Sequence, residues 1–142
     1  MKVYADTSFL ASLYVLDTHS AAARERVEER PRVWFTPLHS AECFHAISKQ
    51  VFYRKILQTE AETVFGALKR DLAAGLWSET AMPENAFELC ADLGRRYGPK
   101  LGVRTLDSLH VACALELKAE RFWTFDERQG KLAKAVGLKI SS

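Results

Sequence analysis

The sequence predicts an α/β protein with a mainly parallel sheet. Short β-prone segments alternate with longer segments of helical periodicity, which is typical of parallel strands joined by crossover helices. The chain of 142 residues has the length of one domain and can bury roughly two-thirds of its unfolded surface. No internal repeat, low-complexity tract or linker divides it, so we expect a single domain over residues 1–142.

The first predicted elements are a strand, two helices and a second strand. Residues 2–5 are a β-prone run, and a helical pattern follows over residues 8–16. A second helix is expected over residues 17–30, because Pro31 stops it. Residues 32–36 (RVWFT) have the aromatic and β-branched composition of a strand.

Long helices dominate the middle of the chain. Pro37 suits the first position of a helix that runs to about residue 55. Residues 59–76 form the next helix, in which Thr59 and Glu62 have the spacing of a capping box. Residues 77–82 are a brief strand or a connector, and a further helix runs from residue 83 to about residue 98.

The last third repeats the alternation. Residues 105–119 form a helix that is apolar on nearly every side, which predicts that it is buried. Residues 121–125 (RFWTF) are strand-like. A helix then runs from Asp126 or Glu127 to residue 136, and a short segment follows at residues 138–140.

Two of the predicted strands end directly before an acid. Asp6 follows residues 2–5, and Asp126 follows the RFWTF strand. In open α/β sheets ligands bind outside the carboxyl ends of the strands, so two parallel strands would bring both carboxylates to one edge. The alternative is that each aspartate caps the helix after it. For either acid alone the two interpretations are equally good, and the occurrence of both acids favours a site.

Asp107 is an acid in the first turn of the apolar helix. The helix N-terminus favours a negative charge by only ~0.3–1 kcal/mol, whereas desolvating an ion costs several kcal/mol. Asp107 must therefore lie at a solvent-exposed end of its helix or face a cation. A divalent metal in an open cleft would satisfy both conditions.

Glu42 lies in the helix that begins at Pro37. Phe44, Ile47 and Val51 mark the buried face of that helix, and Glu42 points away from their centre. Periodicity alone therefore predicts a surface position for Glu42. Carboxylates brought together would repel one another, and a divalent cation removes this conflict. An all-oxygen set of ligands suits Mg²⁺ or Mn²⁺.

The acids occur within four short motifs: YADTSFL, SAE, TLDSLHVACAL and FWTFDERQ. In their order and spacing the chain resembles the PIN-domain ribonucleases, in particular the VapC-type toxins of toxin–antitoxin systems. The D-S-L-H-x-A-C-A-L stretch is the most specific part of the likeness. The resemblance covers almost the whole chain, although residues 53–99 contribute only length and helical pattern.

The resemblance implies a three-layer PIN-like fold with a central, mainly parallel sheet flanked by helices. It implies that four acids bind Mg²⁺ or Mn²⁺ and carry the catalysis: Asp6, Glu42, Asp107 and Asp126. For Glu42 it overrides the periodicity. Three hydroxyls beside the acids would orient the carboxylates or a metal-bound water, or serve as caps: Thr7, Ser8 and Thr124.

The implied reaction is metal-dependent hydrolysis of phosphodiester bonds in single-stranded or structured RNA. The implied partners are a cognate antitoxin that inserts a segment into the acidic cleft and a second copy of the chain in a homodimer. RNA would need basic contacts, for which Arg104, one turn before Asp107, is the best single candidate. Other cations could flank the cleft or form solvated helix faces: Lys49, Arg54, Lys55, Arg95, Arg96 and Lys100. The RNA target and the number of metal ions are not defined by the sequence.

Two alternatives stay open. One is a PIN-like module that binds RNA or protein without cutting. The other is an RNA-processing nuclease outside a toxin–antitoxin system. Other classes are disfavoured, because no paired Cys/His spacing completes a zinc site, Asp6 lacks the acidic neighbour of a receiver domain, and no phosphate-binding glycine loop occurs.

Composition sets the remaining expectations. No apolar run reaches ~18 residues, so no membrane span is expected, and Asp6 interrupts the place where a signal peptide would be apolar. Three cysteines, an odd number without paired spacing, suggest reduced thiols and a cytoplasmic location. The net charge of +2 neither requires nor excludes a nucleic-acid partner.

Overall fold

The computed structural model describes residues 1–140, so the last two residues of the expected domain lie outside the described part. Its centre is a four-stranded sheet in the order β3-β2-β1-β4, in which each neighbouring pair is parallel. The strands are β1 (Lys2–Ala5), β2 (Arg32–Phe35), β3 (Ser78–Glu79) and β4 (Arg121–Trp123). The predicted α/β class and the mainly parallel sheet are therefore confirmed, and a bridge from Ile140 to Phe122 extends the sheet beyond β4.

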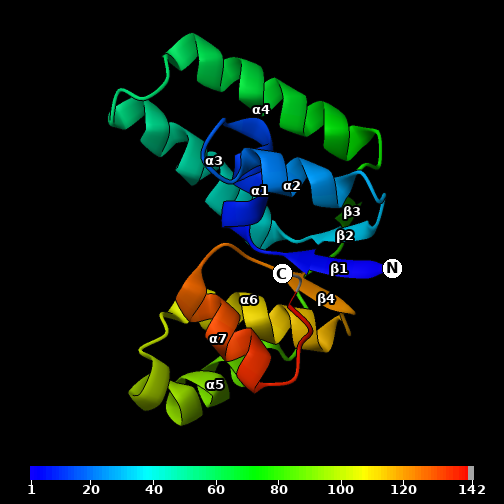
Figure 1. The fold of residues 1–142 in the computed structure, drawn as a ribbon, viewed down its shortest axis with the longest axis vertical. Helices are drawn as coiled ribbons and strands as arrows, with labels where there is room; N and C mark the ends of the chain where they lie inside the picture. The colour runs from blue at the N-terminus through cyan, green and yellow to red at the C-terminus, as the bar shows by residue number, and fades with distance from the viewer. Residues whose placement is uncertain (141–142) are drawn as a thin grey trace.

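Helices follow the strands as the alternation predicts. Within residues 1–140 they are α1 (Thr7–Tyr14), α2 (Ser20–Val27), α3 (Pro37–Phe52), α4 (Gln58–Ala73), α5 (Ala86–Leu101), α6 (Thr105–Glu116) and α7 (Glu127–Ala135). Helices α1 to α4 lie on one side of the sheet, and α5, α6 and α7 lie on the other (Figure 1). This is a three-layer arrangement. No helix in the described part of the chain is both long and apolar enough to cross a membrane.

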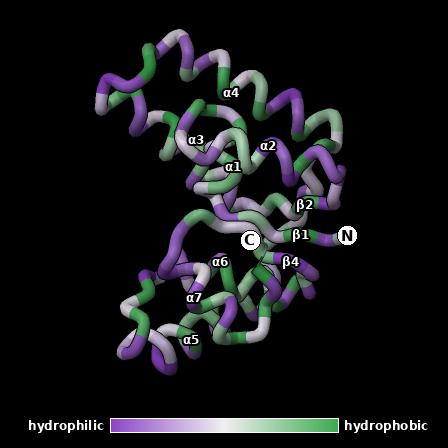
Figure 2. The backbone as a smooth tube through the Cα atoms, viewed as in Figure 1, coloured by the Kyte–Doolittle hydropathy of each residue, from purple (hydrophilic) through white to green (hydrophobic). Residues whose placement is uncertain are grey.

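Strand alternation divides the core between the two faces. Val3 and Ala5 point to the side of α1 and α3, where they pack with Phe9 and other buried apolar residues. Tyr4 points to the opposite side, where it packs with residues of α5, α6 and α7 such as Val111. The segments farthest from the sheet, including much of α4 and α5, carry many of the hydrophilic residues (Figure 2). Because β1 is buried on both faces, its carboxyl end is firmly placed.

Three predicted helix starts were wrong. Helix α2 begins at Ser20 rather than at residue 17. The capping box at Thr59 does not form, because α4 begins one residue earlier and the Glu60 side chain accepts from the Leu57 N–H at 2.9 Å. Helix α5 begins at Ala86 rather than at residue 83, and it continues past Pro99 to Leu101, with Gly102 as its C-cap. Gly102 has a φ of +61°, a left-handed conformation that glycine adopts without steric cost.

Candidate active site

The carboxyl ends of three strands converge on one edge of the sheet. Ala5 of β1 pairs with Trp123 of β4, so Asp6 and Asp126 emerge on the same side, as the alternation predicted. Strand β2 runs parallel beside β1 and leads through Thr36 into α3, which carries Glu42. The shared edge therefore follows from the strand directions alone.

Asp6 is almost fully buried, with 3% of its surface exposed. Its Oδ1 accepts from the Phe9 N–H and from the Ser8 hydroxyl, both at 2.8 Å, so Asp6 is the N-cap of α1. Its Oδ2 accepts from the Thr124 hydroxyl. Burial raises the pKa of Asp6, and the hydrogen bonds from Thr124, Phe9 and Ser8 only partly oppose this rise.

Asp126 has the same kind of double role at α7. Its Oδ1 accepts from the Gln129 N–H at 2.7 Å, which makes Asp126 the N-cap of that helix. Its own N–H donates to the Thr124 hydroxyl at 2.9 Å. Thr124 therefore joins Asp6 to the backbone of Asp126. Gln129, which the sequence did not single out, is buried and donates to the Asp107 carbonyl at 3.3 Å.

Asp107 faces a cation of its own chain. It is buried in the first turn of α6, and the Arg104 Nε lies 3.0 Å from its Oδ2. The same guanidinium reaches Asp126, with Nη2 3.7 Å from Oδ2. The hydrogen bond to Asp107 raises the pKa of Arg104 further above its ordinary value. Arg104, the best candidate for an RNA contact, thus bridges two of the predicted catalytic acids.

The surface position that periodicity predicted for Glu42 is wrong. Its side chain is 25% exposed, and its Oε1 accepts from the Thr7 hydroxyl at 2.8 Å and from the His110 ring at Nε2. Burial raises the pKa of Glu42, but the bonds from His110 and Thr7 outweigh it and the net pKa is lowered. Residues of α1 and α6 supply these partners, and a helical wheel of α3 contains neither.

His110 is the main functional candidate that sequence reasoning passed over. It lies in α6 three positions after Asp107, where residues share one helix face. Since its Nε2 donates to a carboxylate, its Nδ1 in the neutral ring accepts from the buried Tyr4 hydroxyl, which lies 2.7 Å away. The spacing of D-S-L-H, which places His110 one turn after Asp107, was the available signal.

His39 fixes the backbone just before Asp6. Its Nδ1 accepts from the Thr36 N–H at 2.9 Å, so its Nε2 donates to the Ala5 carbonyl, at 2.7 Å. Burial lowers the pKa of His39 to about 3, which keeps the ring neutral. The ring thus holds the ends of β1 and β2 together at the site.

The thiols are not suited to nucleophilic catalysis. All three cysteines are buried and free of disulfides. Burial raises the pKa of Cys43 to about 12 and that of Cys113 to about 11. Since a thiolate is the reactive form, these side chains are inert at neutral pH.

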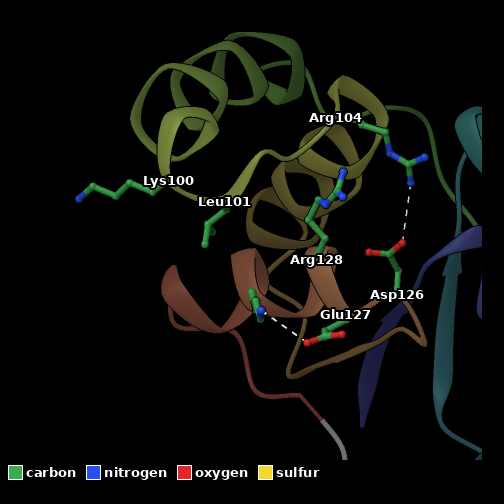
Figure 3. A pocket seen from close by; sticks show the side chains of 7 residues that line it. Lys100, Leu101, Arg104, Asp126, Glu127 and Arg128 are labelled. Carbon is green, nitrogen blue, oxygen red and sulfur yellow. Dashed lines mark ion pairs between the residues drawn. The ribbon is translucent and has the colours of Figure 1, made fainter.

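Two pockets open beside the acids. The first, here called the basic pocket, has a volume of about 510 Å³ and is lined by Lys100, Leu101, Arg104, Asp126, Glu127, Arg128 and Lys131 (Figure 3). The second has a volume of about 680 Å³, and Thr7, Ser8 and Glu42 lie on it among apolar residues that include Leu106. The acids therefore lie between a charged pocket and an apolar one.

The donor atoms at this edge suit a hard divalent cation, since they are carboxylate and hydroxyl oxygens. Within residues 1–140, however, no three side chains of His, Cys, Asp or Glu come close enough together to form a ready metal site. Arg104 occupies the position between Asp107 and Asp126. The chemistry of the donors fits Mg²⁺ or Mn²⁺, and the metal site itself stays a prediction.

A parallel α/β sheet with acids gathered outside its carboxyl edge defines a class of proteins that bind ligands at that edge. The PIN domain family model matches residues 3–135, and the chain belongs to this family. No curated protein sequence matches it.

Three solved structures share the fold, each with a TM-score of 0.69. VapBC2 from Rickettsia felis, bound to a DNA fragment from its promoter, is 12% identical over 99% of this chain and 98% of that chain. VapC20 from Mycobacterium tuberculosis, a toxin that cleaves the sarcin-ricin loop, is 16% identical over 96% of this chain and 95% of that chain. FitAcB from Neisseria gonorrhoeae is 14% identical over 99% of this chain and 96% of that chain.

Proposed function

We propose that the chain is a metal-dependent endoribonuclease that hydrolyses phosphodiester bonds of single-stranded RNA. The observation that carries this proposal is the placement of the acids at the carboxyl edge of the sheet in a PIN domain. Thr124 and Ser8 hold Asp6 in place. No protein nucleophile is needed, and the protonated thiols offer none.

Asp6, Glu42, Asp107 and Asp126 would together hold Mg²⁺ or Mn²⁺. When bound, such an ion supplies a water of lowered pKa and neutralises the charge that develops on phosphorus oxygens. The chain's own contribution is orientation. Thr7 and His110 fix one oxygen of Glu42, and Thr124 fixes one oxygen of Asp6. Hydroxyl groups and one imidazole ring therefore fix the orientation of these carboxylates.

The toxin of a VapBC-type toxin–antitoxin pair is the role that we propose for this nuclease. The shared fold with VapBC2 and VapC20 supports it. A cognate antitoxin would insert a segment into the acidic cleft and block it, the toxin would form a homodimer, and the pair would act in the cytoplasm. A gene for a small DNA-binding protein directly beside this one would separate this role from RNA processing outside such a pair.

The test is RNA cleavage by purified protein with Mg²⁺, with Mn²⁺ and with EDTA. We expect cleavage with a divalent cation and none with EDTA, and we expect Glu42→Gln to abolish it. Glu88→Gln, which neutralises an exposed glutamate in α5, is the matched control and should cleave normally. Cleavage mapping in total cellular RNA would define the target. A wild-type protein that cuts no RNA and binds neither cation would leave only the non-cutting binding module.

A further inference from the structure

The basic pocket carries more positive charge than its carboxylates balance. Four cationic side chains and two carboxylates line it, so its lining has a net charge of +2. Glu127 is paired with Lys131 at 3.5 Å, and Asp126 is paired with Arg104 at 3.7 Å. In residues 1–140 no carboxylate forms an ion pair with Arg128 or Lys100. The unbalanced charge therefore lies at the end of α5 and the start of α7.

Arg128 is the cation that the structure holds in place. One nitrogen of its guanidinium donates to the Gly102 carbonyl at 3.2 Å, at the turn that ends α5. In Figure 3 the guanidinium of Arg104 points to Asp126, while Lys100 extends outward from the pocket. The remaining N–H groups of Arg128 form a planar fork, the geometry that binds two oxygens of one phosphate. The nearby N-terminus of α7 adds a positive helix dipole.

The position of the pocket indicates which anion it binds. Asp126 lines the pocket and is also one of the proposed catalytic acids. An RNA strand that places one phosphate at those acids must continue past them. Its neighbouring phosphates then need cations beside the acids. We infer that the basic pocket binds a phosphate of the RNA strand beside the bond that is cut. This inference rests on the proposed ribonuclease activity for its choice of ligand.

The experiment measures binding of a fluorescently labelled oligouridylate by anisotropy at several salt concentrations, with EDTA present so that no cleavage occurs. The pocket variant is Arg128→Gln with Lys131→Gln. The control is Lys118→Gln with Lys134→Gln, which removes the same charge from two exposed lysines that do not line the pocket. For single strands the slope of log K against log salt changes by ~0.7 for each phosphate contact.

We expect the pocket variant to bind more weakly. The slope of log K against log salt should be smaller in magnitude by at least ~0.7, the value of one phosphate contact, while the control keeps the wild-type slope. Equal slopes for the wild type and the pocket variant would overturn the inference, as would a wild type that binds no RNA. Displacement of the RNA by polyglutamate of equal charge would also overturn it, because the pocket would then recognise charge alone.

Cleavage assays on the same proteins separate the two proposals. If the wild type cuts RNA but the slopes are equal, only the phosphate subsite fails. If the wild type does not cut but the pocket variant loses a contact, the subsite stands and the nuclease proposal fails. Among active proteins, the pocket variant should show a raised KM and an unchanged kcat, because the contact lies away from the reacting bond.

Discussion

Arg104→Gln should increase the affinity of the protein for Mn²⁺. Arg104 pairs with Asp107 at 3.0 Å and reaches Asp126 at 3.7 Å, so it neutralises two of the acids proposed to bind the metal. A divalent cation that uses these carboxylates must displace the guanidinium. Glutamine removes the charge while it keeps most of the side chain.

The magnitude follows from the exposure of the ion pairs. The Arg104 side chain is 69% exposed, and exposed ion pairs contribute ~0.2–1 kcal/mol each. Loss of both pairs corresponds to an Mn²⁺ affinity about 2- to 30-fold tighter, at 1.4 kcal/mol for each factor of ten. The metal-free variant should also melt at a lower temperature than the wild type, because the buried Asp107 carboxylate is left without its partner. Addition of Mn²⁺ should restore the melting temperature.

Isothermal titration of each protein with Mn²⁺, without RNA, measures this effect independently of activity. Lys100→Gln is the control, since Lys100 lines the same pocket but forms no ion pair with the acids in residues 1–140. An affinity that is unchanged in Arg104→Gln, or raised equally in Lys100→Gln, would refute direct competition. RNA binding should change in the opposite direction, because Arg104 also lines the basic pocket.

Three further predictions concern stability, measured by urea unfolding. Asp6→Asn should stabilise the metal-free protein at neutral pH, because its pKa is raised in the fold; this advantage should vanish as the pH falls through that raised pKa towards 3.8. His39 should stabilise the fold above its unfolded pKa of 6.5 and lose that contribution as the pH falls towards about 3, by about 1.4 kcal/mol per pH unit; a His39→Gln variant with the wild-type pH slope would contradict this. His110→Phe should cost about 1–3 kcal/mol, because it leaves the buried Tyr4 hydroxyl without its partner, and an additive double variant with Tyr4→Phe would show that the two side chains are not coupled.

The strands and the shared edge could be predicted because they depend on local patterns. The apolar runs before Asp6 and Asp126 mark strands at the correct places, and parallel pairing then fixes their common edge. Helix starts were less predictable, as at α4, where Glu60 rather than Glu62 bonds the backbone before the helix. Competing caps at adjacent positions differ by little free energy, so the packing of α4 decides between them.

The surroundings of Glu42 could not be predicted from its own helix. Its partner His110 is 68 positions away in the sequence, and Thr7 is 35 positions away. A helical wheel reports which residues share a face of α3, but it contains no information about polar groups that other helices bring to that face. Resemblance to a family gave the right expectation that Glu42 is not simply solvated, although it did not supply the histidine.

The sequence left open whether Asp6 and Asp126 cap helices or belong to a site. In the structure each of them caps a helix with one oxygen and has a second oxygen available for the site. A carboxylate has two oxygens, and in Asp126 one caps α7 while the other faces Arg104. The cap fixes the torsion of the side chain, so the second oxygen has a defined position without further contacts. In Asp6 the second oxygen is held by Thr124, so both oxygens of this buried acid accept hydrogen bonds. If one oxygen of Asp126 serves the cap and the other serves the site, Asp126→Asn should retain the cap of α7 and lose only the affinity for a cation. A variant that loses helix stability and metal affinity to the same extent would show that the two roles cannot be separated.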